Sequence, residues 1–379
     1  MSEATKIDLQ GLLAEVGPVI AEHSARHDRD GTFVSEAYDV LRKGHVFGAL
    51  VPLALGGGGA SMAEMCTFLK DLAKLCPQTA LSLSMHTHLV AVNVWKSNTG
   101  KGGEAVLKRV AAEQLVLLST GATDWIDSNG EMTKVDGGYR YSSRKVFGSG
   151  GPAADVIVSS GRYEDPERGA RVLHFPIPMS AEGVRSAGDW DTLGMRGTGS
   201  NTLVLEDVFI PDEAIALDRP SGQWHPLWSA VLTIAVPIYM SVYAGIAEKA
   251  AELTRAAVKT KRDPHVESLV GEVENALVQA TLAWSSMVEN AGNLTLAPTI
   301  DDANGALIRK TLCTNAAKLT VERAMVATGG RAFYRKQPFE RLFRDVQAAH
   351  FHPLPEHRQL PFSGRVALGR DPITGQSAS

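Results

Sequence analysis

Two changes of hydrophobic period divide the 379-residue chain into three parts, and they constrain its fold more than any other feature. From about residue 7 to 117, apolar side chains recur at the spacing of amphipathic helices. From about 118 to 222, short runs rich in valine, isoleucine and aromatics are separated by glycine, proline and aspartate, which is typical of strands joined by turns. Helical spacing then returns. We therefore predict an α+β protein with an N-terminal helical domain (1–117), an antiparallel β-domain (118–222) and a C-terminal helical bundle (223–379).

Local signals add detail to this division. The triplet Asp136-Gly137-Gly138 predicts a β-hairpin. Three alanine-rich stretches have a broad apolar face and predict the long helices of a bundle, at 228–259, 266–294 and 302–327. The first of these is also the most apolar part of the chain, but it is rich in alanine and serine and contains Pro237. We therefore expect a buried helix there and no membrane span.

Composition excludes several classes of function. The net charge is −4, and Lys and Arg are scattered among Asp and Glu, so we expect neither nucleic acid nor a membrane surface as a partner. The three cysteines lie far apart and show no metal-ligand spacing, so we expect no metal site and no disulfide framework. The first residues lack the pattern of a signal peptide. These features favour a cytoplasmic protein.

Two glycine-containing motifs carry more specific information. The first begins at Leu193-Gly-Met-Arg-Gly and ends at Val208-Phe-Ile-Pro211, so it joins a glycine loop to a strand. The second begins at Gly329-Gly330, passes through Phe333-Tyr334 and ends at Arg344-Asp345. Together they resemble the β-domain signature and the last core helices of the acyl-CoA dehydrogenase superfamily of flavoproteins. The resemblance implies a homotetramer that binds a flavin (FAD or FMN) between the β-domain and the bundle.

The same resemblance implies which residues contact the flavin. The stretch that begins at Lys145 is similar to a family strand on which an aromatic side chain packs on the flavin ring and a hydroxyl group hydrogen-bonds it. Another family strand that contacts the flavin falls at Leu117-Leu-Ser-Thr-Gly121. The acidic Gly-Ser-Asp loop that normally follows it is not recognisable here. The flavin-contacting residues implied by the resemblance are Ser119, Thr120, Phe147, Ser149, Gly150, Gly329 and Gly330.

Three departures from the family pattern bear on the reaction. In the dehydrogenases a catalytic glutamate follows the Arg-Asp pair, and the matching residue here is Pro353, which cannot accept a proton. The alternative position on the first bundle helix holds Ser229, so Glu356 is the nearest candidate for a relocated base. The family's Arg-x-x-Phe-Gly motif, which binds FAD across a subunit interface, is replaced by a segment with Lys261 and Arg262. Those charges can still meet a phosphate, or a smaller flavin suffices.

Four histidines lie in the segments that the resemblance places near the substrate. His350 and His352 flank Phe351, and in an extended segment both rings face one side. His86 and His88 fall on a predicted helix in the region that lines the family's substrate cavity. An imidazole beside a flavin can move a proton near neutral pH.

This combination resembles the flavin-dependent monooxygenases of the same superfamily, which oxidise dibenzothiophene, hydroxylate hydroxyphenyl compounds or oxygenate amino sugars. It implies a small-molecule substrate, O₂, reduced flavin from a separate flavin reductase, and functional roles for Ser149 and His352. Two alternatives stay open. One is an FAD-dependent acyl-CoA dehydrogenase in which Glu356 is the base. The other is a catalytically silent flavin-binding scaffold.

Overall fold

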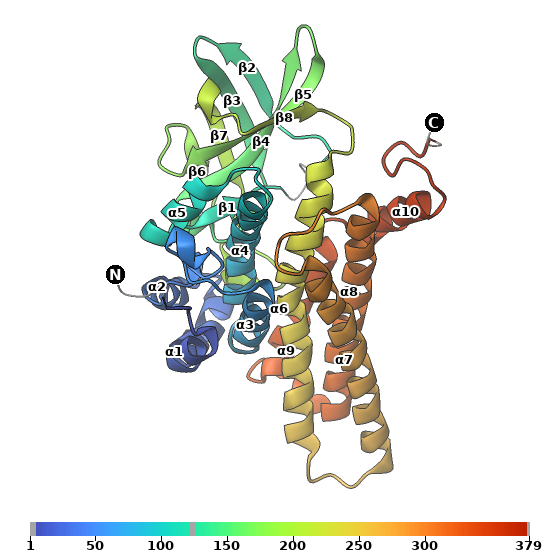
Figure 1. Cartoon of the computed structure of the whole chain (residues 1–379). Helices are drawn as coiled ribbons and strands as arrows, with labels where there is room; N and C mark the ends of the chain where they lie inside the picture. Colours follow the sequence, from blue (N-terminus) through green and yellow to red (C-terminus); the bar gives the residue numbers. More distant parts are fainter. Residues whose placement is uncertain (1–4, 122–125, 377–379) are drawn as a thin grey trace.

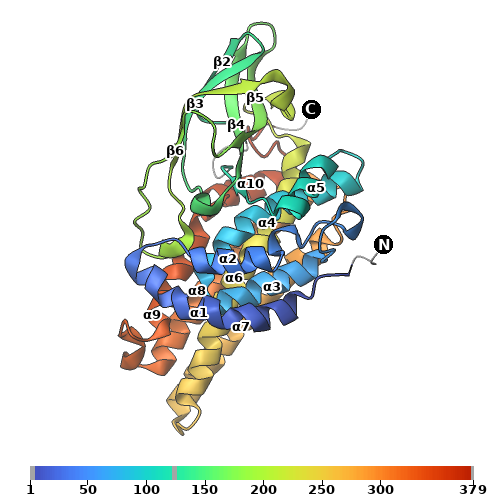
Figure 2. The same ribbon diagram turned by 90° about the vertical axis from the view of Figure 1, so that its left-hand side faces the viewer.

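The computed structural model describes residues 5–121 and 126–376 of the chain. Figure 1 shows a β-sheet at one end of the molecule, a long helical bundle that extends away from it, and the N-terminal helices packed beside the bundle. In the view of Figure 2, α1, α2 and α3 lie in front of α6, and of these three helices α3 packs against it. The N-terminal helices are α1 (Leu9–Asp30), α2 (Ser35–Lys43), α3 (Met62–Leu75), α4 (Pro77–Asn98) and α5 (Glu104–Glu113).

Local sequence explains where the N-terminal helices begin and end. Asp8 caps α1 by accepting a hydrogen bond from the backbone N–H of Gly11, and Gly31 ends the helix in the left-handed conformation. Ser61 and Glu64 form a reciprocal capping box at the start of α3. Pro77 stands in the first turn of α4, where its missing N–H costs nothing. Most of α4 is buried, so this helix is the centre of the N-terminal unit.

The β-domain is a single twisted sheet in the order β6-β7-β3-β2-β4-β5-β8, with β1 paired to β4. Most neighbours are antiparallel, as predicted, but β1 and β2 both run parallel to β4. The sheet is therefore mixed, because the chain reverses at the β2–β3 hairpin and again before β4. The strands are β1 (Leu117–Ser119), β2 (Glu131–Val135), β3 (Gly138–Lys145), β4 (Val156–Asp165), β5 (Gly169–Pro178), β6 (Val184–Ser186), β7 (Leu203–Pro211) and β8 (Leu217–Pro220).

The predicted hairpin at residues 136–138 is confirmed. Val135 of β2 pairs with Gly138 of β3, so only Asp136 and Gly137 form the turn. Gly137 has φ +71°, a left-handed value that side chains with a Cβ rarely adopt.

The predicted long helices of the C-terminal bundle are also present. The helices of this part are α6 (Pro226–Val258), α7 (Pro264–Ala291), α8 (Ile300–Thr328), α9 (Pro338–Val346) and α10 (Glu356–Ala367). By length and composition α6 could cross a membrane, but 94% of its most apolar 18-residue window is buried within the protein. Gly245 lets α6 approach α3 closely, since a Cβ there would lie 2.1 Å from the carbonyl oxygen of Lys70. The apolar face of α6 thus forms the core of the molecule.

The prediction for the two C-terminal histidines is wrong in one respect. His350 lies in a short 3₁₀ turn (Gln347–Phe351), and only His352 begins an extended segment. The two rings therefore point to different partners. His350 contacts Lys318, whereas His352 contacts Tyr243.

Candidate active site

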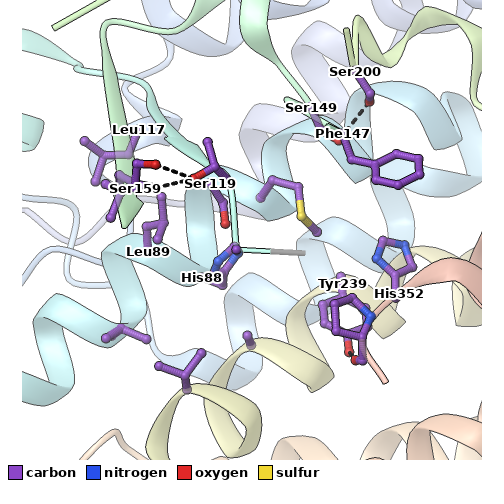
Figure 3. A pocket seen from close by; sticks show the side chains of 18 of the residues that line it. His88, Leu89, Leu117, Ser119, Phe147, Ser149, Ser159, Ser200, Tyr239 and His352 are labelled. Atoms are coloured by element: carbon purple, nitrogen blue, oxygen red, sulfur yellow. Dashed lines mark hydrogen bonds between the residues drawn. The ribbon is translucent and has the colours of Figure 1, made fainter. Parts of the chain in front are cut away.

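A cavity of about 770 Å³ opens where α4, the β-domain, α6 and the segment after α9 meet. Figure 3 shows side chains from these elements pointing into it. Most of the wall is apolar and includes the side chains of Leu81, Met85, Leu89, Val92, Leu117, Val231, Leu232 and Ala235. A few polar groups converge on this space, which is the usual make-up of a small-molecule site.

The β-domain contributes hydroxyl groups to one wall of the cavity. Ser149 and Ser200 are hydrogen-bonded at 2.8 Å, and Ser200 in turn bonds Thr198 at 2.6 Å (Figure 3). Thr120 donates to the carbonyl oxygen of Val158. Four of the predicted cofactor contacts therefore lie on this wall together, namely Ser119, Thr120, Phe147 and Ser149.

Phe147 stands out on this wall because its backbone is strained and its ring is exposed. Its φ is +60°, a left-handed value that is rare for a bulky residue. The side chain is 47% exposed and meets Trp190 edge-on, with 6.1 Å between ring centroids. Ser149 donates its backbone N–H to the Phe147 carbonyl at 2.8 Å, which holds the turn. Strain of this kind is typical of functional sites, and here it presents a free aromatic face.

His352 lies on the opposite side of the cavity and is fixed by two tyrosines of α6. Its ring stacks on Tyr239, with 4.6 Å between centroids, and its Nε2 lies 2.6 Å from the Tyr243 hydroxyl. Burial raises the pKa of Tyr243 well above its usual value, so this hydroxyl stays protonated and can donate to Nε2. In that tautomer His352 carries its own proton on Nδ1. Burial, with smaller effects from the charges of Lys310 and His88, lowers its pKa to about 3.

A buried lysine holds the backbone of this segment. The ammonium of Lys310 donates to the carbonyl oxygens of His352 and Leu354, each at 3.0 Å. Tyr239 donates to the next carbonyl, that of Pro353, at 3.1 Å. The position of the His352 ring is thus determined by α6 and α8 together.

His88 presents the opposite hydrogen-bonding group to the cavity. Its Nδ1 lies 3.3 Å from the Ser84 carbonyl oxygen, which can only accept, so Nδ1 carries the proton. Burial lowers the pKa of His88 to about 4, so the ring is neutral near pH 7. The side chain is only 8% exposed, and within the described ranges no group bonds Nε2. This nitrogen is therefore an acceptor without a partner on the cavity wall.

The acceptor on His88 leads to a binding prediction. We expect the protein to bind 2-naphthol about tenfold more tightly than 2-methoxynaphthalene, because one hydrogen bond contributes about 1–1.5 kcal/mol. The variant His88→Leu should lose this preference, as measured by titration calorimetry. Met85→Leu, a change on the same wall without a hydrogen bond, should keep it. A preference that survives in His88→Leu would show that the hydroxyl binds elsewhere.

His86 has a different position, although it is only two residues away. Its Nε2 lies 2.9 Å from the Phe47 carbonyl oxygen, and its Nδ1 accepts a 2.9 Å bond from the backbone N–H of Leu117. It does not line the cavity. Both nitrogens are engaged within the protein, so His86 has none left for a substrate. Its bonds instead hold β1, the strand that carries Ser119, against α4.

The other predicted site residues also lie off the cavity wall. Gly150 does not line the cavity, and its N–H donates to the Thr198 carbonyl at 2.9 Å, which helps to hold the turn that carries Phe147 and Ser149. Glu356 is the first residue of α10 and does not line the cavity. Gly329 and Gly330 follow the end of α8. The loop after Gly121, where the family's acidic motif is not recognisable, includes residues 122–125, which lie outside the described ranges.

Arg262 is far from the cavity within one chain. It lies in the loop between α6 and α7, whereas Tyr239 is the last α6 residue on the cavity wall. The helix between them rises about 30 Å at 1.5 Å per residue. Arg262 can therefore reach a cofactor only at a site formed with another subunit.

Sequence models of two domains match this chain. The acyl-CoA dehydrogenase N-terminal domain matches residues 14–114, and the acyl-CoA dehydrogenase C-terminal domain matches residues 235–355. The chain belongs to the acyl-CoA dehydrogenase family. The predicted family, fold and enzyme class, a flavin-dependent oxidoreductase, are thereby confirmed.

Relatives in this family are similar along nearly their whole length. The amino sugar nitrososynthase DnmZ of Streptomyces peucetius is 27% identical, over 96% of this chain and 93% of the relative. The dibenzothiophene monooxygenase of Mycolicibacterium goodii is 26% identical, over 92% and 91%. Among solved structures, KijD3 in complex with FMN and a dTDP-linked amino sugar has a TM-score of 0.85 at 26% identity, covering 96% of this chain and 94% of that one.

Proposed function

We propose that this protein is a flavin-dependent monooxygenase that uses reduced flavin and O₂ to oxidise a small organic substrate. One observation carries the proposal. The cavity wall presents a histidine donor, Nδ1 of His352, and a histidine acceptor, Nε2 of His88, but no Asp or Glu side chain among the residues described. The similar nitrososynthase and dibenzothiophene monooxygenase support the same reaction class.

The residues on the β-domain wall fit a flavin. Phe147 offers an exposed aromatic face, and the hydroxyls of Ser149 and Ser200 lie beside it as donors and acceptors for a heteroaromatic ring (Figure 3). Ser119 lines another part of the same cavity. Reduced flavin, when bound, would supply the electrons that activate O₂. KijD3 binds FMN, and we propose FMN or FAD for this chain.

The protein's own part in the reaction is to place protons and exclude water. His352 holds a proton on Nδ1, with Tyr243 fixing that tautomer from behind. The apolar side chains around the cavity keep the site dry, which strengthens each hydrogen bond inside it. His88 orients the substrate by accepting one hydrogen bond, since its lowered pKa makes it a weak base.

An acyl-CoA dehydrogenase needs a carboxylate that can remove the α-proton of the substrate. The expected relocated base, Glu356, lies off the cavity wall, and Pro353 lies on it. Within the described ranges, no other carboxylate lines the cavity. The geometry therefore favours oxygenation over dehydrogenation.

Two assays distinguish a monooxygenase from an acyl-CoA dehydrogenase. With a flavin reductase, NADH and FMN, we expect the protein to form an oxygenated product from a small aromatic compound, detected by mass spectrometry with ¹⁸O₂. Without the reductase it should form none. Reduction of protein-bound FAD by butyryl-CoA under anaerobic conditions would contradict the proposal and support a dehydrogenase. A protein that does neither would be a silent scaffold.

The flavin reductase, the homotetramer and the cytoplasmic location are further parts of the proposal. Apolar side chains on α7 and α8 support self-association, because many are too exposed for the surface of a lone chain. Light scattering on the purified protein tests the tetramer. The exposed large apolar residues of these two helices are Val278, Leu282, Ile308, Leu312, Leu319 and Val326.

A further inference from the structure

The described wall of the cavity carries three cationic side chains but no carboxylate. Two of the cations are neutralised by carboxylates that lie behind the wall. Arg109 donates to Glu113 at 3.1 Å, and Arg344 donates to Asp28 at 2.6 Å. The third cation is Lys96 of α4. Its ammonium forms no hydrogen bond or ion pair with any residue that the structure describes.

The charge of Lys96 acts inside the cavity. The side chain is partly buried, and burial lowers the pKa of its ammonium without any carboxylate to oppose the effect. His174 also lines the cavity, and its pKa is lowered to about 3, chiefly by burial and also by the charges of Arg219 and Lys96. A desolvated cation without a counter-ion is unfavourable, so an anion that binds beside the Lys96 ammonium is stabilised by it.

Lys96 lies on the same face of α4 as His88. His88, Val92 and Lys96 are spaced four residues apart, so all three lie on the cavity face of α4. The rise from His88 to Lys96 is about 12 Å. Between them the wall carries Leu89, Val92 and Asn93, and the Asn93 amide donates to the Leu89 carbonyl oxygen at 2.8 Å. The face therefore offers an acceptor at one end, a cation at the other and the apolar side chains of Leu89 and Val92 in between.

We propose that Lys96 is an anion subsite and that the substrate is an apolar organic acid. Its carboxylate pairs with the Lys96 ammonium, and its body lies along Val92 toward His88. This subsite rests on the proposed function and deepens it, because it names the substrate class of the same cavity.

The test compares two probes that differ by one charge, 2-naphthoate and 2-naphthamide, by titration calorimetry on the flavin-free protein. We expect the protein to bind 2-naphthoate at least about tenfold more tightly, as charge-assisted hydrogen bonds are the stronger kind. Lys96→Met should reduce the ratio to within about twofold, and Lys96→Arg should retain the preference. Lys101→Met, which removes the same charge just beyond α4 and outside the cavity, should leave the ratio unchanged.

Equal binding of the two probes by the parent protein would overturn the proposal, as would a preference that survives in Lys96→Met. A second arm compares FMN with riboflavin. If Lys96→Met abolishes a preference for FMN, the subsite holds the flavin phosphate and the proposal fails. Neither arm uses a reductase or O₂, so failure of the subsite is distinguishable from failure of the monooxygenase reaction.

Discussion

Replacing His352 by alanine should lower the rate of substrate oxygenation about 10²- to 10³-fold, the range expected when a positioned hydrogen-bond donor to the reacting group is removed. His352 lines the cavity and its Nε2 is engaged by Tyr243, so Nδ1 is the nitrogen left to donate a hydrogen bond to the reacting group. Flavin binding should change little, since the flavin contacts that we propose lie on the β-domain wall. The measurement is product formation in the reductase-coupled reaction, together with hydrogen peroxide release, which should rise as oxygenation fails.

His350→Ala is the matched control for this prediction. It removes the same side chain two positions earlier, but His350 contacts Lys318 and does not line the cavity. Its rate should stay within about twofold of the parent. Tyr243→Phe keeps the His352 ring and releases its tautomer, so a loss of about tenfold in the rate with a small change in KM is expected. If His352→Ala binds flavin and oxidises substrate as fast as the parent, the role assigned to His352 is wrong.

The architecture could be predicted from the sequence because its signals are local. The period of the hydrophobic pattern depends only on neighbouring residues, and the Asp-Gly turn at 136–137 specifies its own hairpin. The parallel pairing of β1 and β2 with β4 could not be predicted in the same way. It depends on how the chain returns to the sheet after β3, and no short stretch of sequence encodes that return.

The candidate site could be predicted only in part, because some of its contacts are local in the sequence and others join distant segments. His86 and His88 were both candidates for the cavity, with a role expected for one or the other, and residues two apart on a helix do not share a face. The sequence could therefore have shown that only one of them reaches the site, though not which one. Tyr243 was missed entirely. Its bond to His352 joins residues separated by 109 positions, and that contact exists only once α6 and the segment after α9 pack together.

The buried carboxyl of Asp345 should make stability depend on pH. One of its oxygens accepts a 2.5 Å bond from the Met195 N–H, and the other has no partner within the described part of the chain. Burial raises its pKa to about 7, although the Met195 N–H and the charge of Arg341 oppose the rise. In the unfolded chain the same carboxyl titrates near its ordinary value of about 3.9. The folded protein thus retains a proton that the unfolded chain releases.

The sign of the effect follows from this difference. The contribution of Asp345 to stability is fully present below about pH 4 and is lost as the pH rises through about 7, at a cost of about 2–4 kcal/mol. Asp345→Asn keeps an oxygen for the Met195 N–H and carries no charge. Relative to the parent, its unfolding free energy in urea should therefore rise by about 2–4 kcal/mol between pH 5 and pH 8. Asp207→Asn, at an exposed carboxylate of β7, should shift by less than about 0.5 kcal/mol. Parallel pH curves for the parent and Asp345→Asn would mean that the buried carboxyl does not titrate in this range.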